Sequence, residues 1–149
     1  PDSYIKDQAQ RLFYYQQMMS ARDQQKLGEA QAEIEDRYGH APVQVRNAFS
    51  IMSLRMRARS LGIEKVDGKG GRLLVSFEDR SAVPPRVWSL VSKKHREAYV
   101  TKESFVWPFV GDAVQAADRM ISCFEAAYEQ LRALREAVRK PPRSLAVPL

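Results

Sequence analysis

The chain has 149 residues, of which 44% are hydrophobic and 28% charged, as expected for one soluble globular domain. No apolar run approaches the roughly 20 residues that span a bilayer, and the sequence does not open with a signal-peptide pattern. The single cysteine, Cys123, excludes an internal disulfide and indicates a cytoplasmic protein. Because the chain begins with Pro1 instead of Met, we expect it to be part of a longer protein.

The net charge of +6 suggests a nucleic-acid partner, but the charges are unevenly distributed. Residues 1–40 carry five Lys/Arg and seven Asp/Glu, whereas residues 41–149 carry 19 and 11. The basic residues are spread over several segments, without an aromatic-rich RNA-binding motif, zinc-finger spacing or clear helix-turn-helix. A solvated basic surface is therefore the preferred interpretation.

Two helices are expected in the first 40 residues. The first is predicted from about Asp7 to Ser20, and its apolar stripe at helical spacing comprises Ile5, Leu12, Tyr15 and Met19, widened by Phe13 and Met18. The second begins after the N-cap Asp23 and continues to Tyr38, with an apolar stripe of Leu27, Ala30, Ile34 and Tyr38. Its opposite side carries a charged row that comprises Glu29, Glu33 and Asp36, with Arg37 at the edge.

A third helix is predicted from Pro42 to Leu61, because Gly39 can end the preceding helix and Pro42 suits a first helical turn. It carries one apolar stripe of Val45, Phe49, Met52 and Met56, and a second of Ile51, Leu54, Ala58 and Leu61. A helix that is apolar over most of its circumference is usually packed on two sides. We therefore expect this helix to be central.

After Gly62 the pattern predicts strands. Residues 63–66 and 72–77 are expected to form a hairpin around a loop at 67–71. A short helix from Pro84–Pro85 to about Lys94 should follow, then strands near 97–101 and 104–107, the last ended by Pro108.

The last helix is predicted from near Gly111–Asp112 to about Arg139. Its heptad-like seam comprises Val114, Ala117, Ile121, Phe124, Tyr128, Leu131 and Val138. Cys123 falls on the apolar face and should be a buried small hydrophobe. The whole is expected to be an α+β domain over residues 1–140, with a helical first half, a small antiparallel sheet and a long C-terminal helix. Residues 141–149 should form a frayed tail.

No residue pattern supports an enzyme, a cofactor or a metal. The glycine cluster at Gly68–Gly71 lacks the Ser/Thr and the following helix of a phosphate-binding loop, so a hairpin turn is the better interpretation. The two histidines, His40 and His95, offer no zinc spacing with Cys123. We expect no catalytic residue, no cofactor and no bound metal in this chain.

The stretch Gln31–Gly62 carries a family resemblance. The residues that carry it are Glu33, the Asp36-Arg37-Tyr38-Gly39 turn, Pro42, Val45, Arg55, Ala58 and Leu61-Gly62-Ile63. It resembles the C-terminal (TRCF) domain of the bacterial transcription-repair coupling factors (Mfd), most strongly from Arg11 to Val66. That family's domain is a regulatory module on a large ATP-dependent DNA translocase, which removes stalled RNA polymerase and recruits nucleotide excision repair.

The resemblance implies an intramolecular partner. In the family, this helix end packs against an N-terminal module that resembles UvrB, which hides the surface that recruits UvrA and restrains the translocase. Glu33, Asp36 and Arg37 match the family's contact positions, and Glu29 extends the same row. On periodicity alone this row is a solvated helix face, and the resemblance favours a docking surface instead. The alternative is an independent nucleic-acid-binding module that uses the basic residues at 55–72 and 132–143, and an enzyme with an unrecognised site is a third possibility.

Overall fold

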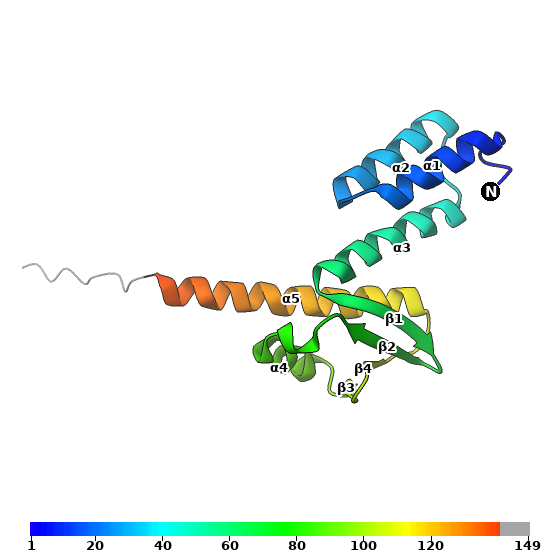
Figure 1. The fold of residues 1–149 in the computed structure, drawn as a ribbon. Helices are drawn as coiled ribbons and strands as arrows, with labels where there is room; N and C mark the ends of the chain where they lie inside the picture. The colour runs from blue at the N-terminus through cyan, green and yellow to red at the C-terminus, as the bar shows by residue number, and fades with distance from the viewer. Residues whose placement is uncertain (141–149) are drawn as a thin grey trace, which may run out of the picture. The chain divides into compact units, whose positions relative to one another are not determined.

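The computed structural model describes residues 1–140, so the predicted tail at 141–149 lies outside the described residues. The chain divides into two compact units, Pro1–Ser60 and Leu61–Leu149, which are described separately below (Figure 1). The prediction of a single domain over residues 1–140 stays a prediction. Among the described residues, no helix is both long and apolar enough to cross a membrane.

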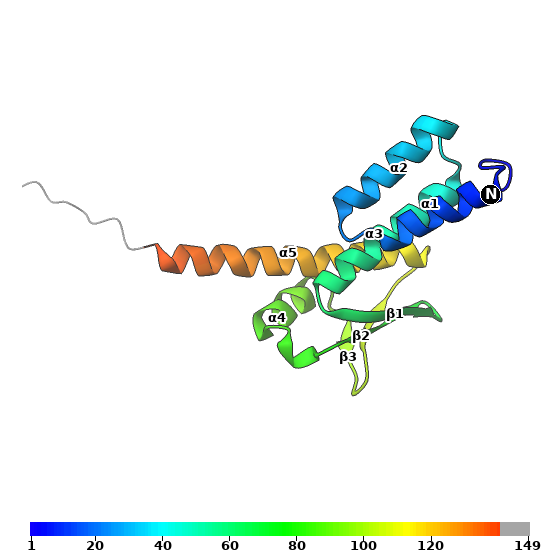
Figure 2. The ribbon, with the colours of Figure 1, turned by 45° about the horizontal axis from the view of Figure 1, so that its top comes forward.

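The first unit consists of α1 (Gln8–Ser20), α2 (Gln24–Tyr38) and α3 (Val43–Ser60). Figure 2 shows α1 and α2 as an antiparallel pair, and α3 contacts both helices. Their ends follow local chemistry. The Asp7 carboxylate accepts a hydrogen bond from the Ala9 amide at 2.8 Å, and Asp23 accepts one from the Lys26 amide at 2.8 Å. Gly39 ends α2 with a φ of 84°, a conformation that favours glycine.

The core of the first unit differs from the prediction on α1. The buried α1 residues are Tyr14 and Met18, whereas Leu12, Tyr15 and Met19 are 57%, 57% and 43% exposed. The predicted stripe was therefore only partly right: its members Ile5 and Met18 are buried, whereas Tyr14 was not part of it. Apolar residues stand next to each other at 13–15 and 18–19, so two helical stripes are equally apolar and periodicity cannot choose between them. The core comprises Ile5, Tyr14, Met18, Leu27, Ala30, Ile34, Phe49 and Met52.

The predicted apolar stripes of α2 and α3 agree better with the buried residues of the structure. The α2 stripe of Leu27, Ala30 and Ile34 is confirmed as buried, with Tyr38 packed at its edge. On α3, Phe49 and Met52 of the first stripe lie in the core, with Val45 and Met56 half-buried against it. The second stripe is less covered: Ala58 is buried, whereas Ile51 is 44% exposed.

The second unit is built on a four-stranded antiparallel sheet in the order β1-β2-β4-β3. The strands are β1 (Ile63–Lys69), β2 (Arg72–Phe77), β3 (Tyr99–Val100) and β4 (Phe105–Pro108). The predicted loop at 67–71 was too long, because β1 continues to Lys69, which pairs with Arg72. Only Gly70 and Gly71 form the turn, with φ of 57° and 69°, as a two-residue primed turn requires.

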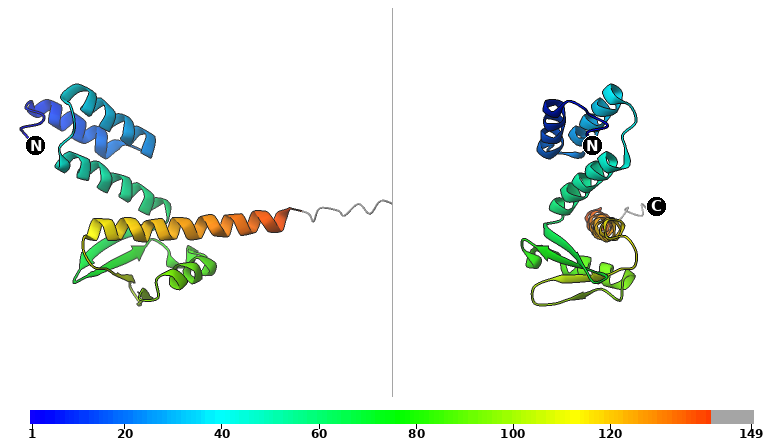
Figure 3. Two further views of the ribbon diagram at one scale, coloured as in Figure 1. Left: turned by 180° about the vertical axis from the view of Figure 1, so that it is seen from behind. Right: turned by 90° about the vertical axis from the view of Figure 1, so that its right-hand side faces the viewer.

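Two α-helices and a short 3-10 turn complete the second unit: the turn at Arg80–Ala82, α4 (Pro85–Lys94) and α5 (Ala113–Arg139). Figure 3 shows α5 lying over one face of the sheet. Phe124 of α5 is fully buried in an aromatic cluster, with ring centroids 5.5–5.7 Å from those of Phe77, Trp88 and Phe105. The α+β class, the small antiparallel sheet and the long final helix are thus confirmed.

The predicted heptad seam of α5 is only partly right. Ile121 and Phe124 are buried, but Val114 and Val138 are 41% and 85% exposed. The buried face comprises Ala116, Met120, Ile121, Cys123, Phe124 and Ala127, because α5 packs against both helix α4 and strand β2. Residues 132–140 are all exposed. Burial raises the pKa of the Cys123 thiol, as expected for a structural cysteine.

Candidate functional site

Chemistry-bearing residues are dispersed in the part of the chain that the structure describes. No group of three or more His, Cys, Asp or Glu side chains there could hold a metal ion. The His95 ring lies against the Trp107 ring, tilted by 43° with centroids 4.0 Å apart, and His40 lies in the connection between α2 and α3. Gly70 and Gly71 of the glycine cluster form the β1–β2 turn. The charged row on α2 is therefore the remaining candidate site.

All four predicted site residues lie on exposed positions of α2: Glu29, Glu33, Asp36 and Arg37. The buried side of the same helix carries Leu27, Ala30 and Ile34, so the charged side chains leave the core packing of α2 unbroken. We call these four residues the α2 charged face. Its role in docking stays a prediction.

Glu29 is already paired within the chain. Its carboxylate accepts hydrogen bonds from Lys26 Nζ at 3.2 Å and from Gln25 Nε2 at 3.1 Å. The bond from Lys26 is the main reason why the pKa of Glu29 lies below its ordinary value. This carboxylate therefore presents little uncompensated charge to a partner.

Glu33 and Arg37 share one neighbour, the hydroxyl of Tyr14 on α1. This hydroxyl donates to Glu33 Oε1 at 3.4 Å and accepts from Arg37 Nη1 at 3.4 Å. The hydrogen bond to Tyr14 is the largest cause of a raised pKa for the Arg37 guanidinium, which also lies 5.8 Å from the Tyr38 ring. Sequence reasoning missed Tyr14, because a contact between two helices leaves no periodic signal.

Asp36 differs from the other three residues. Its side chain is exposed and makes no hydrogen bond or ion pair with any other residue in the range 1–140. An exposed carboxylate without an internal partner keeps its full charge for an external one. Asp36 is therefore the strongest local attraction for a cationic group on the α2 charged face.

The end of α2 that carries these residues is held firmly. The Tyr4 hydroxyl donates to the Gly39 carbonyl oxygen at 2.6 Å. The Tyr38 ring lies edge-on between Tyr4 and Tyr14, with centroid distances of 6.0 and 5.9 Å. The N-terminal segment and α1 thus both fix the position of the α2 end, which makes a rigid platform for recognition.

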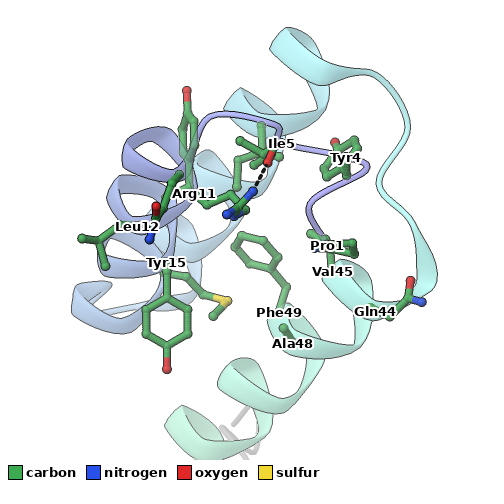
Figure 4. A pocket seen from close by; sticks show the side chains of 14 residues that line it. Pro1, Tyr4, Ile5, Arg11, Leu12, Tyr15, Gln44, Val45, Ala48 and Phe49 are labelled. Atoms are coloured by element: carbon green, nitrogen blue, oxygen red, sulfur yellow. Dashed lines mark hydrogen bonds between the residues drawn. The ribbon is translucent and has the colours of Figure 1, made fainter.

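The first unit also contains an apolar groove of about 590 Å³ between the N-terminal segment, α1 and α3. Figure 4 shows Phe49 pointing into it, and Arg11 donating to the Ile5 carbonyl oxygen at 2.9 Å. Leu12 and Tyr15, the exposed α1 residues, line one wall. Arg11 is the only ionisable side chain of the lining besides its tyrosines, so the groove offers no acid–base or nucleophilic pair.

Comparison with known proteins gives a consistent family. The sequence pattern of the TRCF domain matches residues 1–87. The transcription-repair-coupling factor of Escherichia coli K12 is 37% identical over 87 residues, which cover 57% of this chain and 7% of that protein. The factor of Myxococcus xanthus is 31% identical over 94 residues, or 62% of this chain and 8% of its own length. This chain thus corresponds to less than a tenth of these two relatives.

A solved structure agrees in fold. The crystal structure of the C-terminal domain of a transcription-repair coupling factor superposes with a TM-score of 0.70. The superposition covers 87% of this chain and 88% of that one, at 18% sequence identity. At that identity the likeness establishes a shared fold, which includes the second unit that the sequence pattern covers only in part.

Proposed function

The chain belongs to the TRCF domain family, and from this membership we propose that it is the non-catalytic regulatory C-terminal domain of a transcription-repair coupling factor. In this proposal the domain docks on the N-terminal UvrB-like module of the same factor. Docking covers the surface that binds UvrA and keeps the ATP-dependent translocase restrained until the factor engages stalled RNA polymerase.

The α2 charged face is the observation that carries this proposal. It is exposed, it lies on a helix end fixed by Tyr4 and Tyr38, and it includes one carboxylate, Asp36, without an internal partner. Charged groups of this kind provide orientation and a salt-sensitive, reversible contact with a surface of opposite charge. A contact that must open when polymerase is engaged needs this reversibility.

The first test removes the charges without touching the core. Replacing Glu33, Asp36 and Arg37 together by Ala should leave the free energy of unfolding nearly unchanged, because exposed charges contribute about 0–1 kcal/mol per pair. In the full-length factor the same change should raise UvrA binding and ATP turnover, since truncating charges that a partner desolvates costs about 2–5 kcal/mol. Circular dichroism, UvrA pull-down and ATPase rates measure the three effects.

A matched control is a triple replacement by Ala of exposed polar residues elsewhere on the first unit: Gln16, Gln17 and Arg22. It should leave UvrA binding and ATP turnover at the wild-type level. If the Glu33, Asp36 and Arg37 variant folds and the factor remains equally restrained, the restraining contact lies elsewhere. If that variant unfolds, these residues are structural.

A further inference from the structure

We propose that Tyr14 is a positioning residue for docking: its hydroxyl holds Glu33 and Arg37 in one fixed arrangement before the partner arrives. The inference rests on the proposed function, because it concerns the same α2 charged face. It assigns a role to a residue of α1 that does not itself need to touch the partner.

The chemistry of the Tyr14 hydroxyl allows it to bridge Glu33 and Arg37, because it can donate one hydrogen bond and accept another. A phenol hydroxyl has one proton to donate and lone pairs to accept, so it can serve a carboxylate and a guanidinium at once. Tyr14 does this with Glu33 Oε1 and Arg37 Nη1, both at 3.4 Å. Each contact uses one acceptor site of the Glu33 carboxylate or one N–H donor of the Arg37 guanidinium, so the remaining sites of both groups stay available for a partner.

The hydroxyl can act as a fixed point because the Tyr14 ring cannot move freely. The residue is 2% exposed and belongs to the core of the first unit. Its ring makes edge-on contacts with Phe13 at 5.2 Å and Tyr38 at 5.9 Å. A Glu or Arg side chain on a helix surface otherwise samples many rotamers, and docking must then order it at an entropic cost. A bridge that orders both side chains beforehand lowers this cost.

The bridge also separates the roles within the α2 charged face. Glu33 and Arg37 would form a neutral, shape-defining pair, whereas Asp36 would supply the unpaired negative charge. The surface that best complements this arrangement offers a basic side chain opposite Asp36. It also has both a donor and an acceptor for the Glu33–Arg37 pair. The partner chemistry is therefore a basic protein surface that also carries hydrogen-bond acceptors.

The test is Tyr14→Phe, which keeps the ring and removes only the hydroxyl. The dissociation constant of this chain for the purified UvrB-like module should rise about threefold to tenfold, the value of one lost hydrogen-bond bridge. The melting temperature should change little. In the Arg37→Ala or the Glu33→Ala background the same substitution should have a smaller effect, because one of the two hydrogen-bond partners of the hydroxyl is already gone.

Another tyrosine of α1 provides a matched control. The hydroxyl of Tyr15 makes no hydrogen bond within residues 1–140, so Tyr15→Phe should leave the dissociation constant unchanged. A Tyr14→Phe variant that docks like the wild type, while the Glu33, Asp36 and Arg37 variant does not, overturns the inference and leaves the proposed function standing. Wild-type docking by that triple variant overturns both.

A second measurement guards against a folding defect in Tyr14→Phe. Nitrogen-15 relaxation of arginine side chains in the unmodified chain should show the Arg37 guanidinium as ordered and that of Arg22, an exposed residue before α2, as mobile. Equal mobility of the two side chains would refute the positioning role.

Discussion

The four residues of the α2 charged face differ in what surrounds each of them, although all are exposed. Glu29 is compensated by Lys26, Glu33 and Arg37 are joined through Tyr14, and Asp36 stands alone among the described residues. Their position on the helix face therefore does not show which of them binds a partner most strongly. Their expected contribution to binding depends on the charge that internal pairing leaves uncompensated.

This ranking leads to a prediction for single substitutions that remove one negative charge and keep the shape of the side chain. If a partner desolvates the carboxylate of Asp36, Asp36→Asn should weaken docking on the UvrB-like module by about 2–5 kcal/mol. Glu29→Gln should cost about 0–1 kcal/mol, because the pair with Lys26 is exposed and contributes little. Isothermal titration calorimetry at two salt concentrations measures both effects. A larger loss for Glu29→Gln than for Asp36→Asn would contradict the ranking.

At the scale of elements, α3 packs into the core of the first unit mainly through its first apolar stripe. Phe49 is 4% exposed and packs with residues of α1 and α2, whereas Ile51 on the other side is 44% exposed. The two residues lie on the same helix and differ mainly in burial. They form a natural matched pair.

Phe49→Ala should lower the free energy of unfolding of the first unit by about 3–5 kcal/mol, through lost burial and the cavity that remains. Ile51→Ala should lower it much less, by under about 1 kcal/mol, because little apolar surface is uncovered. Urea unfolding followed by circular dichroism gives both values. Equal effects of the two substitutions would mean that the first stripe of α3 is not the packed one.

The positions of the helix ends could be predicted from the sequence. The face of each helix that is buried could not always be predicted. Asp23 caps α2 as predicted, and Asp7 and Asp112, the approximate predicted starts of the first and last helices, cap α1 and α5, since a cap depends on the few residues around it. On α1 the runs 13–15 and 18–19 left two possible stripes, and only contact with α2 and α3 selects the buried one. On α5 the contacts with both α4 and β2 select a face that a heptad pattern does not describe.

The candidate site, too, could be predicted only in part from the sequence. The exposed positions of Glu33, Asp36 and Arg37 follow from the apolar stripe on the other side of α2, so periodicity predicts them. The connection to Tyr14 spans 19 positions to Glu33 and 23 to Arg37, and it depends on how α1 and α2 pack. No local pattern in the sequence encodes that packing. The internal partners that rank these charges therefore became visible only in the structure.

At the scale of the whole molecule, charge separates along the chain. Residues 1–40 carry an excess of acidic side chains, whereas residues 41–149 carry 19 basic and 11 acidic ones. Arg132, Arg135 and Arg139 lie on the exposed last turns of α5. They belong to one of the two basic segments, 55–72 and 132–143, that an independent nucleic-acid-binding module would use.

Binding to generic duplex DNA distinguishes that module from the regulatory domain. We expect fluorescence anisotropy to give a dissociation constant no tighter than about 10⁻⁶ M at physiological salt, the range of non-specific attraction. Replacing Arg132, Arg135 and Arg139 by Gln should leave docking on the UvrB-like module unchanged. Tight DNA binding whose salt dependence falls in that variant would instead support the nucleic-acid module.

The boundary between the two units has a consequence for the gene. It falls after Ser60, at the end of α3, and each unit is one continuous stretch of chain. The whole core of the first unit and the entire α2 charged face are encoded before it. A single junction in the reading frame therefore separates them from the sheet and α5. Recombination at that codon can exchange everything downstream without interrupting a helix or a strand.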